Sequence, residues 1–117
     1  MVDDNTDAAE TLAMVVRLHG HEVQVAADGP SGLAAAQAME PDVVFLDIGM
    51  PGMNGYEVAT RLRTMPGTRA AVLVALTGWG TAEDRSRSQA AGFDVHLTKP
   101  VDLAAVEQVL SETGAGR

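Results

Sequence analysis

The chain has 117 residues, of which 46% are hydrophobic and 21% are charged, so it is expected to fold as one compact domain and not to remain disordered. Its net charge of −8 disfavours direct binding to the phosphate backbone of nucleic acids. The absence of cysteine excludes disulfides, and the lack of a membrane-spanning apolar run or a signal peptide makes a cytoplasmic location without membrane contact the default expectation.

Five short apolar segments alternate with five helix-like segments along the chain. This repetition is typical of an α/β protein in which a parallel sheet is covered by helices on both faces. The expected strands cover residues 1–2, 21–26, 42–46, 71–76 and 94–97. The third and fourth are nearly continuous apolar runs, as strands buried on both faces are, so they are predicted to lie in the middle of the sheet.

Three of the helices are predicted from apolar residues at helical spacing. The first, over residues 6–19, has Leu12, Val15 and Val16 on one face and is followed by Gly20, a common C-terminal stop. Asp102 can cap the start of the fifth helix. The apolar positions of the third and fifth helices are Val58, Leu62, Met65, Leu103, Val106 and Leu110.

The fourth helix, expected over residues 81–91, contains no apolar residue larger than alanine. It can therefore bury little apolar surface, and we expect it to be held loosely. The domain is predicted to span residues 1–113, with residues 114–117 as a frayed tail.

Polar residues stand at the carboxyl ends of four expected strands: Asp3 and Asp4, Asp47, Thr77 and Lys99. In a parallel α/β sheet these ends share the edge at which ligands bind. Each residue alone has an ordinary explanation, such as a helix cap, a satisfied buried hydroxyl or a solvated lysine. Together, three carboxylates favour a hard divalent cation, usually Mg²⁺, and Lys99 is the single lysine beside seven arginines.

Four motifs at these strand ends make the chain resemble the receiver domains of response regulators in two-component signalling. The resemblance covers essentially the whole chain and implies a flavodoxin-like, doubly wound fold with five helices and five parallel strands in the order 2-1-3-4-5. The motifs are Val-Asp3-Asp4-Asn, Phe-Leu-Asp47-Ile-Gly-Met-Pro-Gly-Met-Asn-Gly, Ala-Leu-Thr77-Gly and Leu-Thr-Lys99-Pro.

The resemblance implies a role for each acidic residue. Asp47 would be the phosphoacceptor, attacking phosphorus in line to form an aspartyl phosphate. Asp4 and Asp47 would bind Mg²⁺ directly together with the backbone carbonyl of Gly49, and Asp3 would act through a bound water.

It also implies roles for residues on the fourth and fifth strands. Lys99 would pair with a phosphoryl oxygen as a compact, movable charge, and Thr77 would donate a hydrogen bond to the phosphoryl group. Pro100 would follow a cis peptide bond that aims Lys99 at the site. His96 stands where the family usually has an aromatic switch residue, and whether the imidazole switches in the same way is left open.

The partners implied are a histidine kinase or a histidine phosphotransfer domain, and an output domain or effector protein. The domain would be a phosphoacceptor and not an enzyme beyond its own phosphorylation and dephosphorylation. The sequence around His96 resembles that of the receivers of hybrid histidine kinases, while a stand-alone regulator and a longer response regulator remain alternatives. Homodimerisation is also left open.

Other functions fit the sequence less well. An aspartate-nucleophile phosphatase needs a second acid two residues after the nucleophile, where this chain has Gly49, and the acids after the first strand disfavour FMN. The runner-up is a pseudo-receiver that is not phosphorylated and acts only as a protein-interaction module.

The first predicted strand is unusually short, because only Met1 and Val2 precede the acid pair, whereas strands usually have about five or six residues. In the implied order this strand lies between the second and third strands, whose backbone groups would lack partners. We expect that the chain begins inside its own first strand and that the acid pair is poorly anchored as a result.

Overall fold

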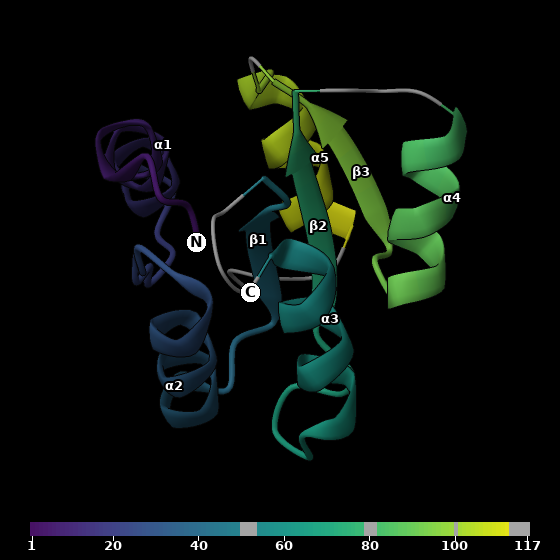
Figure 1. Ribbon diagram of the computed structural model, residues 1–117. Coiled ribbons are helices and arrows are strands. Elements are labelled where there is room, and N and C mark those ends of the chain that lie inside the picture. Colours follow the sequence, from purple (N-terminus) through teal and green to yellow (C-terminus); the bar gives the residue numbers. More distant parts are fainter. Residues whose placement is uncertain (50–53, 79–81, 100, 113–117) are drawn as a thin grey trace.

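The computed structural model describes residues 1–49, 54–78, 82–99 and 101–112 (Figure 1). Within these ranges one parallel sheet has the order β1-β2-β3, formed by β1 (Val43–Asp47), β2 (Val72–Thr77) and β3 (Val95–Thr98). The helices are α1 (Thr6–Leu18), α2 (Gly29–Met39), α3 (Gly55–Thr64), α4 (Ala82–Ala91) and α5 (Leu103–Glu112). No helix in the described ranges is long and apolar enough to cross a membrane.

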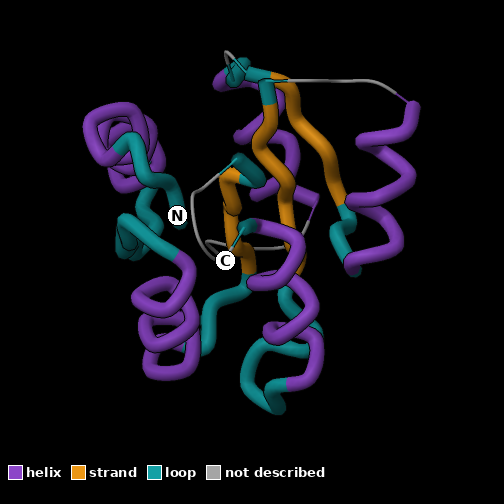
Figure 2. The backbone as a smooth tube through the Cα atoms, viewed as in Figure 1, coloured by secondary structure: helices purple, strands orange, loops and turns teal. Residues whose placement is uncertain are grey.

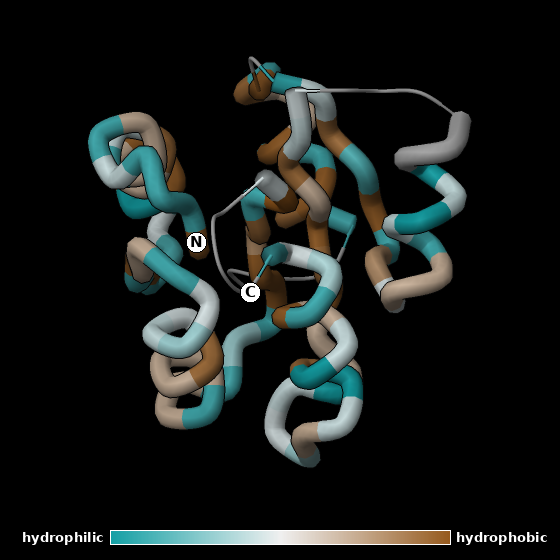
Figure 3. Tube along the Cα trace, viewed as in Figure 1, coloured by the Kyte–Doolittle hydropathy of each residue, from teal (hydrophilic) through white to brown (hydrophobic). Residues whose placement is uncertain are grey.

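The sheet separates two apolar layers. Residues of β1 alternate between them: Val44 and Leu46 pack with residues of α2 and α3, whereas Phe45 packs with residues of α1 and α5. Figure 2 shows the strands between α3 on one side and α5 on the other, and Figure 3 shows that the strands are mostly hydrophobic. Burial on both faces explains the continuous apolar runs of β1 and β2. β2 lies between β1 and β3, as predicted, whereas the central position expected for β1 depends on the five-strand order.

The first two predicted strands are reduced to isolated bridges. Val2 makes one parallel bridge to Ala26 and one to Leu46, so it lies between these two residues. Residues 21–25 belong to no strand, because the two residues ahead of Asp3 are too few to form a ladder along them. The described residues thus form a sheet of three strands, and the five-strand order stays a prediction.

Four helices begin at a side chain that accepts a backbone N–H. The helix N-terminus leaves amides without intrahelical partners, and short polar side chains satisfy them. The capping residues are Asn5 for α1, Asp28 for α2, Asn54 for α3 and Asp102 for α5. The predicted end of the first helix lies one residue beyond the observed one, and Met65 is the residue that follows α3. Residue 81, the predicted start of the fourth helix, lies outside the described residues.

The guanidinium group of Arg63 in α3 ties α3 to the loops that lead into β2 and β3. It donates to the Gly92 carbonyl from Nε (3.0 Å) and Nη2 (2.7 Å), and to the Ala71 carbonyl from Nη1 (2.6 Å). Nη2 also lies 2.6 Å from Oδ2 of Asp94, which accepts the Leu73 amide at 2.9 Å. The branched, planar donor set of arginine suits this arrangement, which one ammonium could not satisfy.

We predict that Arg63→Lys lowers the free energy of unfolding by about 1.5–3 kcal/mol, since several charge-assisted hydrogen bonds to carbonyls are lost. Urea unfolding measures the change. Arg61→Lys is the matched control, because Arg61 is exposed in the same helix. Equal stabilities for the two variants would show that the Arg63 contacts contribute nothing net.

Candidate functional site

The carboxyl ends of the strands bring polar residues to one edge of the sheet. Asp47 and Thr77 are the last residues of β1 and β2, and Lys99 directly follows β3. The register places Asp47 opposite Leu76 and Thr77 opposite Thr98, so the strands end nearly level. The edge therefore collects side chains that are far apart in the sequence, as predicted.

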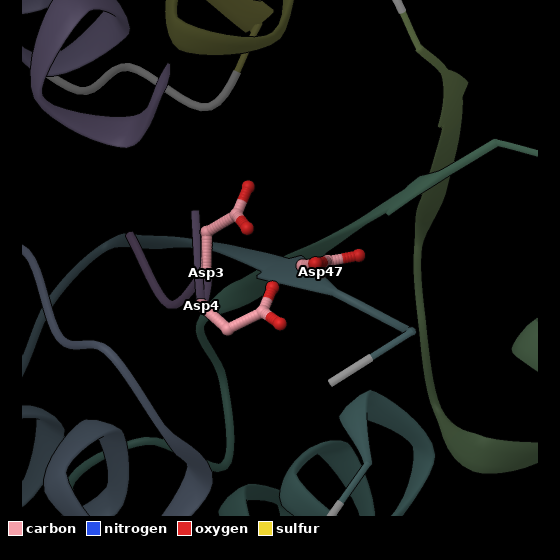
Figure 4. Close-up of side chains that lie close together, drawn as sticks. All are labelled: Asp3, Asp4 and Asp47. Carbon is pink, nitrogen blue, oxygen red and sulfur yellow. The ribbon is translucent and has the colours of Figure 1, made fainter. Parts of the chain in front are cut away.

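Three carboxylates converge at this edge. Oxygen atoms of Asp3, Asp4 and Asp47 all lie within 4.8 Å of one another. Figure 4 shows Asp3 and Asp4 on the segment ahead of α1, beside Asp47 at the end of β1. Asp3 and Asp47 are only 4% and 7% exposed, whereas Asp4 is exposed to solvent. The cluster is thus half inside the protein and open on the side of Asp4.

Backbone amides fix one oxygen of each buried carboxylate. The Asn5 amide donates to Oδ1 of Asp3 (2.9 Å), and the Gly49 amide donates to Oδ1 of Asp47 (3.1 Å). The second oxygens face the ammonium of Lys99, whose Nζ lies 3.2 Å from Asp3 Oδ2 and 3.5 Å from Asp47 Oδ2. Each of these two carboxylates is therefore held by a backbone amide two residues further along the chain, and both face the same ammonium group.

Burial raises the pKa of Asp47 to about 6; the Gly49 amide opposes this shift, while the neighbouring Asp3 carboxylate adds to it. Burial alone would lower the pKa of Lys99, but the carboxylates of Asp3 and Asp47 outweigh it, so the pKa of Lys99 is raised. The cluster has three acids beside one ammonium, which pairs with Asp3 and Asp47, and the excess of negative charge favours a further cation.

The donor set fits a hard divalent cation. Carboxylate oxygens are the ligands that Mg²⁺ prefers, and a site open to solvent lets the ion keep several waters. Asp3, Asp4 and Asp47 supply such oxygens within one ion's reach. The assignment of the Gly49 carbonyl as a further ligand stays a prediction, and Pro100 with its expected cis peptide bond lies outside the described residues.

Thr77 and His96 lie on β2 and β3, the strands that lead to this edge of the sheet. Thr77 is 3% exposed, and its carbonyl accepts the Lys99 amide at 2.7 Å. His96 lies on β3 opposite Ala75, with Nδ1 3.2 Å from the hydroxyl of Ser88 on α4. The expected switch position thus contacts the fourth helix, and Thr77 contacts the backbone of Lys99.

Two residues near the site were missed from sequence. Ser88 is 2% exposed, and its hydroxyl makes a polar contact from α4 to β3. In the sequence, its burial is indicated only by its position three residues before the partly buried Ala91, on the same face of the helix. Gly55 begins α3, where an added Cβ would lie 2.8 Å from the Asp47 carbonyl oxygen. The Asn-Gly pair at this helix start was the available signal for close packing beneath Asp47.

The chain matches known proteins over nearly its whole length. The family model described as "Response regulator receiver domain" matches residues 1–111. The "Probable transcriptional regulatory protein TcrX" of Mycobacterium tuberculosis is 38% identical over 107 residues, which are 91% of this chain. The chain spans only 44% of TcrX.

Solved structures agree with this match. The chemotaxis protein CheY4 of Vibrio cholerae has a TM-score of 0.89 at 28% identity, with 96% of this chain and 93% of that chain covered. The receiver domain of the sensor histidine kinase PA1611 from Pseudomonas aeruginosa has a TM-score of 0.86 at 26% identity and covers 97% and 93%, respectively. That structure holds a magnesium ion in its active-site cleft.

We predict that Asp47→Asn stabilises the metal-free protein at pH 7. Because the pKa of Asp47 is higher in the folded protein than its ordinary value of 3.8, the folded state loses stability as the pH rises from about 4 to about 6. Asparagine removes this cost, and we expect a gain of about 1–2 kcal/mol after solvent screening at the open edge.

Urea unfolding in EDTA at pH 7 and pH 4 measures this difference, which should shrink toward zero at pH 4. Asp42→Asn, at an exposed aspartate just ahead of β1, is the control and should show no such pH dependence. A destabilised Asp47→Asn protein at pH 7 would contradict the cost assigned to the buried Asp47 charge.

Proposed function

The chain belongs to the response regulator receiver family of two-component signalling, and on this basis we propose that Asp47 accepts a phosphoryl group from a phosphohistidine in a Mg²⁺-dependent reaction. The observation that carries the proposal is the convergence of Asp3, Asp4 and Asp47 with Lys99 at one sheet edge. Members of this family are signalling domains and not conventional enzymes.

Asp47 is the acid best placed to act as the nucleophile. Its Oδ1 is held by the Gly49 amide, while Oδ2 lies at the edge near Lys99. Asp3, by contrast, is more deeply buried and makes the closer contact with Lys99. In the transfer, an oxygen of Asp47 forms a bond to phosphorus as the phosphorus–nitrogen bond breaks, and the imidazole leaves with the electron pair.

The three acids would also bind Mg²⁺. Asp4 and Asp47 would bind it directly with the Gly49 carbonyl, and Asp3 would act through a water. Mg²⁺, when bound, neutralises charge on the phosphoryl oxygens. The magnesium ion in the PA1611 receiver supports this assignment, as does the excess of carboxylates over ammonium groups at the site.

Lys99 and Thr77 would stabilise the phosphorylated state. The ammonium of Lys99 already lies within 3.5 Å of Asp47 Oδ2, so it can reach an oxygen of a phosphoryl group attached there. The Thr77 hydroxyl, at the end of the neighbouring strand, would donate a hydrogen bond to the same group. These contacts would pull β2 and the start of the Lys99 loop toward Asp47.

The donor would be a histidine kinase or a histidine phosphotransfer domain, and the recipient of the signal an output domain or effector protein. TcrX is named as a transcriptional regulatory protein, and PA1611 as a sensor histidine kinase. These names support two of the three possible parent proteins, a longer response regulator and a hybrid kinase. The third possible parent is a stand-alone regulator.

We predict that incubation with acetyl phosphate and Mg²⁺ adds the mass of one phosphoryl group to the chain, because the site supplies nucleophile, cation ligands and Lys99. Asp47→Asn should gain none, and EDTA should abolish the reaction of the unaltered protein. Asp4→Asn should need more Mg²⁺ for the same rate, since it lacks one ligand oxygen.

Intact-mass spectrometry is the measurement, and the exposed Asp42→Asn variant should react as the unaltered protein does. If Asp47→Asn gained the phosphoryl mass at the normal rate, the nucleophile would be assigned wrongly. A chain that binds no phosphoryl group under any of these conditions would favour a pseudo-receiver.

We also predict that phosphorylation alters the face made by α4, β3 and α5. The described contacts of α4 are largely polar, with Ser88 at His96 and the Arg87 guanidinium 4.3 Å from the centre of the Tyr56 ring. A helix attached in this way has few apolar contacts to lose when β3 shifts.

Hydrogen exchange with beryllofluoride as a phosphate mimic should therefore change most between Thr77 and Lys99. Asp47→Asn is the control and should show no response to the mimic. Changes confined to α1 and α2 would rule out this face as the output surface.

A further inference from the structure

Tyr56, the second residue of α3, lies where α3 meets α4 and the residues that lead into β3. The guanidinium carbon of Arg87 on α4 lies 4.3 Å from the centre of the Tyr56 ring. The ring of Phe93, just ahead of β3, meets the Tyr56 ring edge to face, with 6.4 Å between the ring centres and 77° between the ring planes. One aromatic side chain thus joins three segments of the chain.

The backbone that carries Tyr56 is fixed to the end of β1. The Gly55 amide donates to the Ile48 carbonyl (3.3 Å), and a Cβ added at Gly55 would lie 2.8 Å from the Asp47 carbonyl oxygen. This close approach leaves no room for α3 to move toward the strand. The hydrogen bonds of Arg63 hold the other end of the same helix. Tyr56 therefore offers α4 a contact on an element that stays in place.

α4 has a second attachment, to β3, at the residue that follows Arg87. The hydroxyl of Ser88 lies 3.2 Å from Nδ1 of His96 on β3. If β3 moves toward a phosphoryl group at Asp47, this contact draws α4 along with the strand, whereas Arg87 holds α4 to Tyr56. The two contacts therefore act on α4 in opposite senses when the strand moves.

Apolar packing contributes little to the attachment of α4, because the helix contains no apolar residue larger than alanine. Arg87 is exposed and Tyr56 is half-buried. A guanidinium group over an aromatic ring at such a site favours the paired arrangement by about two- to fivefold. With so little apolar packing to compete, a factor of this size can shift the balance between two positions of the helix.

We propose that the contact between the Arg87 guanidinium and the Tyr56 ring restrains α4 in the unphosphorylated protein and is lost when α4 moves in response to a phosphoryl group at Asp47. The proposal rests on the function proposed above for Asp47. A contact made in only one of two states biases the protein toward that state, and a ligand that favours the other state must overcome the bias. The restraint thus lowers the affinity of the protein for a phosphate mimic and limits activation in its absence.

Loss of the contact should therefore tighten the binding of beryllofluoride. In the presence of Mg²⁺, Arg87→Gln should lower the Kd of beryllofluoride by about two- to fivefold, because only the unphosphorylated state loses a stabilising contact. The sign separates the restraint from simple electrostatics, since removal of a positive charge would by itself weaken the binding of an anion. Arg61→Gln, at an exposed arginine of α3, is the control for net charge and should not tighten binding.

Substitutions of Tyr56 test the ring itself. Tyr56→Phe keeps an aromatic face for the guanidinium group and should leave the Kd unchanged, whereas Tyr56→Leu removes that face and should lower the Kd as Arg87→Gln does. In a double-mutant cycle both substitutions remove the same contact, so the double variant should bind beryllofluoride no more tightly than either single variant. Titration followed by the amide chemical shifts of α4 measures these affinities.

Hydrogen exchange supplies a measurement that does not depend on ligand binding. Without beryllofluoride, the amides of α4 should exchange about two- to fivefold faster in Arg87→Gln than in Arg61→Gln. Equal exchange rates, fully additive effects in the double variant, or a Kd for Arg87→Gln at or above that of Arg61→Gln would overturn the restraint alone. If the unaltered protein bound no beryllofluoride, the function proposed for Asp47 would fail and the restraint with it, so the two failures can be told apart.

Discussion

Two backbone hydrogen bonds hold the functional edge together: the Val2 amide donates to the Phe45 carbonyl, and the Asp47 amide donates to the Val2 carbonyl, each at 2.8 Å. They bind the start of the chain to the end of β1. As a result, the two acids that follow Val2 and the acid that ends β1 meet within 4.8 Å. Without this pairing, Asp3 and Asp4 would be surface residues ahead of a helix, and Asp47 would stand alone.

The cluster so formed is unfavourable to the protein that carries it. Two carboxylates are nearly buried, and burial, with a smaller contribution from the neighbouring Asp3 carboxylate, raises the pKa of Asp47 well above its ordinary value although Lys99 lies beside it. The same feature makes the edge attractive to a divalent cation and, through it, to a phosphoryl group. The residues of this edge thus carry the electrostatic cost that the proposed function would require, whereas the Arg63 contacts join α3 to the loops at the other end of the strands.

The sequence predicts the ends of the later strands better than it predicts the beginning of the sheet. Apolar runs that end in Asp47 and Thr77, and the lone lysine at position 99, identify strand ends directly, because an abrupt change from apolar to polar marks the edge of a buried strand. The strand expected over residues 21–26 is absent, since strand formation depends on a partner, and the partner has too few residues ahead of Asp3. Ser88 and Gly55 were missed for a related reason: their importance comes from distant contacts, with His96 and with the Asp47 backbone.

The way the helices are attached to the sheet determines which of them can move when Asp47 is modified. Beneath Asp47, α3 is fixed by the close approach of Gly55 and by the hydrogen bonds of Arg63, so that side cannot yield without steric conflict. On the other side, the Lys99 amide is bonded to the Thr77 carbonyl, and three residues back along β3 His96 meets the hydroxyl of Ser88. A shift of Lys99 toward a phosphoryl group would therefore displace β3 and strain a polar contact to α4. The contact between His96 and Ser88 is a single hydrogen bond, whereas α3 is held by several hydrogen bonds of Arg63 and by the close approach of Gly55. The difference in attachment between α3 and α4 thus directs the response of the proposed switch toward α4.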